Sequence, residues 1–199
     1  MTPELNQAIQ ASQNETVRAL VRALDLHEPG EGDHAERVAV YAVATGERMG
    51  MSQEDLLVLR RAAALHDVGK ISISQGLLRK LGELSDEDIA QLRAHATMAI
   101  RIIKSFDWLA NAAPIIKHHH ERWDGFGYPD GLSGGDIPLG ARIIAVAETF
   151  DVLAHEGGYR ATMPESEALA EIRASAGTQF DPKVVDAFCL VQPLIQPLI

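Results

Sequence analysis

The chain has 199 residues, a net charge of −10 and a hydrophobic content of 46%, which suffices for one well-packed core. Its acidic balance excludes the basic surface by which proteins bind nucleic-acid polymers, so a small phosphate ligand would depend on metal ions or a few cations. No apolar run approaches the roughly 20 residues of a membrane span, and the single cysteine, Cys189, has no partner for an internal disulfide. We therefore expect a cytoplasmic protein without a membrane segment.

The N-terminal half of the sequence shows helical spacing of apolar residues, interrupted by glycine-containing turns. Polar residues able to cap a helix precede several of these stretches, and glycines follow them. The predicted elements are a pair of helices within residues 4–26, a helix over 33–49 capped by Asp33, and a helix over 52–69. The last turn of the third element is expected to carry His66 and Asp67.

Helical spacing continues in the C-terminal half but fails over residues 121–139. The predicted helices are one over 85–103 opened by the Ser85 and Asp88 pair, one over 107–120 with a break near Pro114, one over 141–153, one starting at Pro164, and one over 181–190. The irregular segment is too long for a mere connector. It combines glycines with the aromatic residues Trp123, Phe126 and Tyr128, so we expect it to be functional.

The absence of clear β-branched alternation predicts an all-α fold class. The length favours one principal domain. We assign residues 1–32 to N-terminal helices that pack on or lead into the core, 33–191 to the principal domain, and 192–199 to an apolar tail containing proline.

The residues with the clearest chemical potential are His66 and Asp67, followed by Lys70. An imidazole beside a carboxylate can ligate one metal ion while the carboxylate bridges to a second. Each of these residues alone is explained as well by a position at a helix end, where histidine and lysine favour the negative end of the dipole. Further histidines on separate predicted helices make a shared metal site the better explanation; they are His34, His95, His119 and His120.

These residues belong to longer stretches that resemble HD-GYP phosphodiesterases, within the HD superfamily of metal-dependent phosphohydrolases. The stretches are HDVGK at 66–70, HHERWDGFGYP at 119–129, and residues 137–138 and 141–147. The resemblance extends from about Thr16 to Val191 and includes residues 34–38 and 178–182. It implies an HD-superfamily helical bundle with a long Gly-rich GYP loop, and a binuclear or trinuclear metal-dependent phosphodiesterase that hydrolyses cyclic di-GMP to linear pGpG or onward to GMP.

By matching position, the resemblance also implies the roles of individual residues. One ion would be held by His34, His66, Asp67 and Glu148, and Asp67 would bridge to a second ion held by His95, His119 and His120. Asp67 and Lys70 are the implied catalytic residues, and Lys70, Arg160 and Arg122 the implied substrate contacts. The implied nucleophile is a hydroxide bridging the ions. The expected cofactors are two divalent ions, iron or manganese, with zinc, nickel and magnesium as alternatives.

Three positions depart from the family pattern. Glu148 stands where relatives have aspartate, and Gly30 stands where some relatives supply a carboxylate to a third ion, so we expect two ions. Gly157 replaces the first of two basic residues, leaving Arg160 as the match. Arg122 would compensate for the lost phosphate contact, although a salt bridge that braces the long loop explains it equally well.

Two other functions remain open. The departures at Glu148 and Gly157 favour a module that binds a cyclic dinucleotide with little turnover. The same metal ligands would also suit a hydrolase of another cyclic dinucleotide or nucleotide, because base recognition is not legible in the sequence. A homodimer, or a protein partner at the loop around Tyr128, would supply regulation.

Overall fold

The computed structural model describes residues 2–155 and 162–195, and within these ranges the chain is helical without a β-strand. The prediction of an all-α fold is confirmed. The α-helices are α1 (Pro3–His27), α2 (Glu31–Arg48), α3 (Gln53–Leu65), α4 (Gln75–Leu78), α5 (Asp86–Arg93), α6 (His95–Ile103), α7 (Ala113–Lys117), α8 (Leu139–Ala154), α9 (Glu165–Ala174) and α10 (Pro182–Ile195), and the 3-10 helices are η1 (Val68–Ser72), η2 (Asp107–Leu109) and η3 (Gly134–Asp136).

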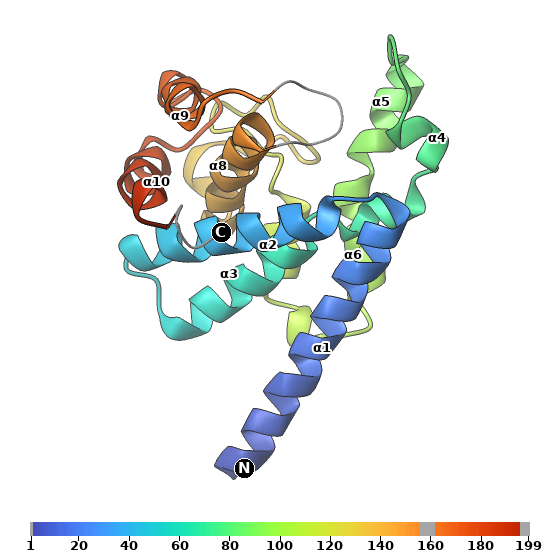
Figure 1. The fold of residues 1–199 in the computed structure, drawn as a ribbon, viewed down its shortest axis with the longest axis vertical. Coiled ribbons are helices and arrows are strands. Elements are labelled where there is room, and N and C mark those ends of the chain that lie inside the picture. Colours follow the sequence, from blue (N-terminus) through green and yellow to red (C-terminus); the bar gives the residue numbers. More distant parts are fainter. Residues whose placement is uncertain (1, 156–161, 196–199) are drawn as a thin grey trace.

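Helix α8 forms the centre of the bundle and packs against α2, α7, α9 and α10. Its sequence is apolar around most of its circumference, which is typical of a helix enclosed by others. Phe150 of α8 meets Tyr41 of α2 and Phe188 of α10, with each pair of ring centroids 5.2 Å apart. This aromatic cluster joins α2, α8 and α10, while α3 lies along the other side of α2 (Figure 1).

The first helix differs from its prediction. The structure has one helix of 25 residues instead of a pair, because neither glycine nor proline interrupts the sequence after Pro3. Its C-terminal half packs on the body through Val17 and Leu24, whereas residues 3–12 are all exposed. Figure 1 shows this N-terminal half extending away from the other helices.

The start of α2 is set by a residue outside the helix. Gly30, with φ of 101°, is the N-cap, and the side chain of Asp25 accepts hydrogen bonds from the backbone N–H groups of Gly30 and Gly32, each at 3.0 Å. The prediction that Asp33 caps this helix is therefore wrong. Asp33 lies in the first turn, where its charge favours the positive end of the helix dipole.

Two predicted long helices are divided in the structure. The segment 85–103 forms α5 and α6 with Ala94 between them, although the predicted capping box of Ser85 and Asp88 is confirmed. The segment 107–120 forms only η2 and the short α7, and the histidines follow α7 in a turn. Helix α10 continues to Ile195, into the predicted tail. No described helix combines the length and apolar character needed to cross a membrane.

Candidate metal centre

The structure brings most of the predicted metal ligands together between α2, α3, α6 and the turn after α7. These side chains form two groups. Within each group, every side chain offers one nitrogen or oxygen atom, and these atoms all lie within 4.8 Å of one another. The first group consists of Asp67, His95, His119 and His120, and the second of His34, His66 and Asp67. Asp67 is the residue that the two groups share, so a single carboxylate joins two candidate half-sites.

Three of the histidines are oriented by the same local device at a helix end. The Nδ1 atom of each ring lies within hydrogen-bond distance of the backbone carbonyl three residues earlier. The pairs are His66 with Ala63 at 2.7 Å, His95 with Leu92 at 2.6 Å, and His119 with Ile116 at 2.6 Å. Because a carbonyl only accepts, Nδ1 must donate, so Nε2 is the ring nitrogen that remains for a metal ion.

His34 is oriented by a buried carboxylate instead. Its Nδ1 donates to Oδ2 of Asp151 at 2.7 Å, and Arg37 binds the same carboxylate through Nε and Nη2 at 2.7 and 2.9 Å. Burial acts to raise the pKa of Asp151, but the hydrogen bonds from His34 and Arg37 outweigh it and hold the pKa below its usual value. Asp151 was not among the site residues predicted from the sequence. The feature of the sequence that could have indicated it is an aspartate one turn after Glu148 in a largely apolar helix.

Replacing Asp151 with asparagine is expected to weaken the binding of one of two metal ions about 10–100-fold, the usual effect of removing a partner that orients a metal-binding histidine. The amide has nearly the same shape but leaves His34 without a charged acceptor for Nδ1. Titration of metal-free protein with Mn(II) measures both affinities. Equal affinities in the variant and the wild type would show that His34 needs no such orientation.

Gly69 allows the residues around Asp67 to approach α6. A Cβ atom at this position would overlap the backbone carbonyl oxygen of His95, so any larger residue would force η1 away from α6. The close approach places Oδ1 of Asp67 3.2 Å from Nε2 of His95 and 4.0 Å from Nε2 of His119. On the other side, Oδ2 of Asp67 lies 3.3 Å from Nε2 of His66.

The buried atoms at the centre fit a metal ion. Nε2 of His66 and Oδ1 of Asp67 are buried and have no hydrogen-bond partner among the described residues, and each would otherwise cost the energy of an unpaired polar group. Burial lowers the pKa of His119 and of His120, which keeps both rings neutral and able to ligate. Burial acts to lower the pKa of His66, but Asp67 outweighs it and raises that pKa to about 9, so binding of an ion would release a proton from this ring.

Lys70 faces the same carboxylate. Its Nζ atom lies 2.8 Å from Oδ2 of Asp67 and 2.9 Å from Oε1 of Glu31, the first residue of α2. Burial, followed by the charge of Asp67, raises the pKa of Glu31. Its Oε2 atom is buried and has no hydrogen-bond partner in the part of the chain that the structure describes. Glu31 was not among the residues predicted from the sequence, because its place beside Lys70 depends on where α2 begins.

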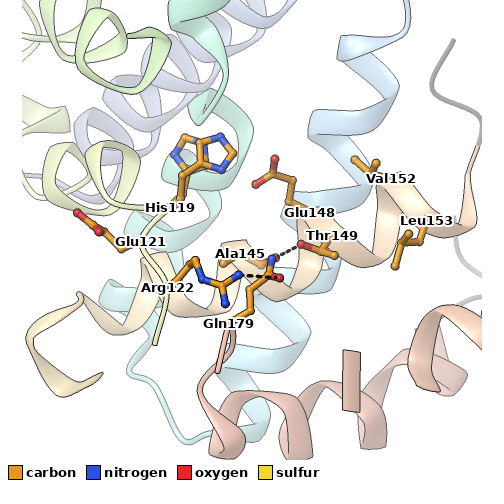
Figure 2. A pocket seen from close by; sticks show the side chains of 10 residues that line it. His119, Glu121, Arg122, Ala145, Glu148, Thr149, Val152, Leu153 and Gln179 are labelled. Carbon is orange, nitrogen blue, oxygen red and sulfur yellow. Dashed lines mark hydrogen bonds between the residues drawn. The ribbon is translucent and has the colours of Figure 1, made fainter. Parts of the chain in front are cut away.

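Glu148 belongs to neither group of clustered ligand atoms within the described residues. It lines a cavity of about 230 Å³ next to the centre, together with His119, His120 and Arg122. Figure 2 shows its carboxylate directed from α8 toward His119. Its role as a metal ligand stays a prediction.

The predicted substrate contacts have different surroundings. Arg122 binds Asp124 through Nε at 3.0 Å and Nη2 at 2.7 Å, and its Nη1 donates to Gln179 at 3.3 Å (Figure 2). These contacts are those expected if Arg122 braces the loop, although its side chain also lines the cavity. Arg160 and Gly157 lie outside the described residues.

An all-α bundle with a buried histidine and aspartate centre at a helix end defines the class of HD-type metal proteins. The chain belongs to the HD domain family, whose model matches residues 18–184. The family is metal-dependent, and the predicted resemblance to HD-GYP phosphodiesterases is confirmed.

Two curated relatives and one solved structure are similar over most of the chain. The chain is 36% identical over 181 residues to the cyclic di-GMP phosphodiesterase response regulator RpfG of Xanthomonas campestris, covering 90% of this chain and 48% of the relative. It is 38% identical over 167 residues to the 3'3'-cGAMP-specific phosphodiesterase 3 of Vibrio cholerae, covering 84% and 36%. The crystal structure of a cyclic GMP-AMP specific phosphodiesterase of Vibrio cholerae matches with a TM-score of 0.71 and 26% identity, covering 92% of this chain and 49% of that chain. The chain thus spans about half the length of these relatives or less.

Proposed function

We propose that this chain is a phosphodiesterase that hydrolyses cyclic di-GMP to linear pGpG, and onward to GMP, at a centre of two divalent metal ions. The observation that carries the proposal is the position of Asp67 between two sets of histidines. A carboxylate shared by two half-sites is the arrangement needed to hold two ions close enough to act on one phosphate. The names of the relatives support a cyclic dinucleotide as the substrate.

Each side chain of the centre has a distinct part in this proposal. The first ion would be held by His34, His66 and Glu148, the second by His95, His119 and His120, and Asp67 would serve both. When bound, the ions would polarise the phosphate and lower the pKa of water. Nitrogen and carboxylate ligands without thiolates favour iron or manganese, with zinc, nickel and magnesium as alternatives. Lys70 would turn from Asp67 and Glu31 to the substrate phosphate as a mobile point charge.

The cavity beside the centre is the proposed entrance for the substrate. Its polar lining includes Arg122, Glu148, Thr149 and Gln179, and its wall also contains Val152 and Leu153. An acidic protein needs such local groups, because its overall charge repels a dinucleotide. We place the catalytic unit in residues 33–191 and assign residues 1–32 to N-terminal helices that pack on or lead into it. Regulation would come through a second copy or a protein partner at the loop around Tyr128.

Hydrolysis of a panel of cyclic dinucleotides tests this proposal. The chain, loaded with Mn(II), is incubated separately with cyclic di-GMP, 3'3'-cGAMP and cyclic di-AMP, and products are separated by chromatography. The proposal expects cyclic di-GMP to be linearised in a reaction that a chelator abolishes. Faster cleavage of 3'3'-cGAMP or cyclic di-AMP would show that the substrate is a different cyclic dinucleotide. If none of the three is cleaved, the proposal that the chain is an enzyme is wrong.

A second candidate is a metal-holding module that binds a cyclic dinucleotide with little turnover. The position of Glu148 outside both groups of clustered ligand atoms favours it, because the half-site of His34 and His66 would then have one ligand fewer. Tight binding of cyclic di-GMP by calorimetry, without product after long incubation, would distinguish this module from the hydrolase.

A further inference from the structure

The five histidines of the centre differ in how their rings are held. Four of them place Nδ1 against an acceptor that fixes the ring, which is a backbone carbonyl for His66, His95 and His119 and Asp151 for His34. His120 has no acceptor at Nδ1 within the described parts of the chain. Its Nε2 atom nevertheless lies 3.1 Å from Nε2 of His95, so the ring points into the same centre as the others.

The ring of His120 is instead covered by an aromatic side chain. Tyr128 stacks on it with centroids 4.8 Å apart and an interplanar angle of 29°. The guanidinium carbon of Arg93, at the end of α5, lies 5.1 Å from the centre of the Tyr128 ring. Offset stacking and a cation over an aromatic face are each attractive. Arg93, Tyr128 and His120 therefore form a continuous stack from the end of α5 to the turn after α7.

The backbone of the loop folds back so that this stack can form. The N–H group of Tyr128 donates to the carbonyl oxygen of His120 at 3.2 Å. A Cβ atom at Gly127 would overlap the backbone of residues 120–122, so only glycine allows so close a return. The return is also tied by buried Glu121, which accepts a hydrogen bond from the backbone N–H of Asp130 at 2.8 Å.

A further set of contacts holds the loop to the end of α7 and to the turn that follows it. The carboxylate of Asp130 lies 2.6 Å from Nζ of Lys117 and 3.0 Å from Nε2 of His118. Two of the three aromatic residues of the loop have different surroundings. Phe126 is 85% exposed, whereas Tyr128 is partly buried against His120.

We propose that Tyr128 is a positioning residue, which orients His120 toward the second metal ion by stacking and so replaces the hydrogen bond that the other four histidines have. The loop at residues 121–130 then serves as a bracket for one half-site, in addition to any contact with a partner. This inference rests on the proposed function in one respect, which is that His120 holds a metal ion.

Mn(II) titration of metal-free variants tests the role of Tyr128. Replacing Tyr128 with leucine is expected to weaken one of the two binding steps about tenfold, in the lower part of the range for partners that orient a ligand. Tyr128→Phe keeps the aromatic ring and is expected to retain the wild-type affinity for Mn(II). Phe126→Leu is the matched control, since it makes the same kind of change at the exposed aromatic residue of the same loop.

A double-mutant comparison separates positioning from a general effect on folding. In a His120→Ala background, Tyr128→Leu is expected to cause no further loss of Mn(II) affinity, because its effect passes through the missing ring. An equal further loss in that background would overturn the inference, as would failure of Tyr128→Phe to retain the wild-type affinity. Melting curves of metal-free protein report folding, and Tyr128→Met replaces the leucine variant if the latter does not fold.

The two proposals fail in different ways in this experiment. If wild-type protein binds a single Mn(II) ion, the binuclear part of the proposed function is wrong. If wild-type protein binds two ions and Tyr128→Leu binds both with unchanged affinity, the binuclear centre stands and only the role of Tyr128 is wrong.

Discussion

Replacing Asp67 with alanine is expected to lower cyclic di-GMP hydrolysis at least about a thousandfold, since ions supply several kcal/mol of transition-state stabilisation and each 1.36 kcal/mol is a factor of ten. The reason is that Asp67 is the residue shared by the two groups of ligand atoms. Its loss removes a ligand from both ions at once, whereas the loss of one histidine would affect one half-site.

The Asp67→Ala prediction requires metal counting and turnover on the same sample. We expect the wild type to carry two ions per chain and the variant to carry fewer than one after removal of loosely bound metal. Asp136→Ala is a suitable control, because Asp136 is an exposed carboxylate of η3 and lies in neither group. A variant that retains both ions and wild-type turnover would disprove the shared-carboxylate arrangement.

Replacing Lys70 with methionine is expected to lower kcat/KM about 10–150-fold while leaving two ions bound, because a hydrogen bond to a charged group contributes about 1.5–3 kcal/mol. Lys70 faces Asp67 and Glu31. Burial acts to lower the pKa of Lys70, but these two carboxylates raise it, so the side chain stays charged for a phosphate.

Steady-state kinetics and melting curves check the Lys70 prediction together. Without metal, Lys70→Met removes the cation that Asp67 and Glu31 share, so its melting temperature should fall, and added Mn(II) should largely restore it. Lys104→Met makes the same change at an exposed lysine and should alter neither quantity. Unchanged kcat/KM, or loss of an ion, would show that Lys70 has a different role.

The helical fold was predictable because its signals are local. Spacing of apolar residues predicted α8 and most of α3, and the Ser85 and Asp88 pair predicted the start of α5. The end predicted for α3 at residue 69 was wrong, because the helix ends at Leu65, His66 is its C-cap and Asp67 precedes η1. The start of α2 was not predictable in this way, because its cap comes from Asp25 in the preceding helix. The division between α5 and α6 was likewise not predictable, because neither glycine nor proline marks it within residues 85–103.

The centre was predictable to the extent that its ligands stand in recognisable sequence patterns. The residues that orient those ligands were not, because their roles depend on contacts between distant segments. Asp151 reaches His34 across 117 positions, and Tyr128 covers His120 only after the chain reverses at Gly127.

Electron paramagnetic resonance of the chain loaded with two equivalents of Mn(II) examines the shared role of Asp67. Two ions joined by one carboxylate are expected to give an exchange-coupled spectrum, and this spectrum should disappear in Asp67→Ala. A spectrum of isolated Mn(II) ions in the wild type, or saturation at one ion per chain, would contradict a binuclear centre built on Asp67.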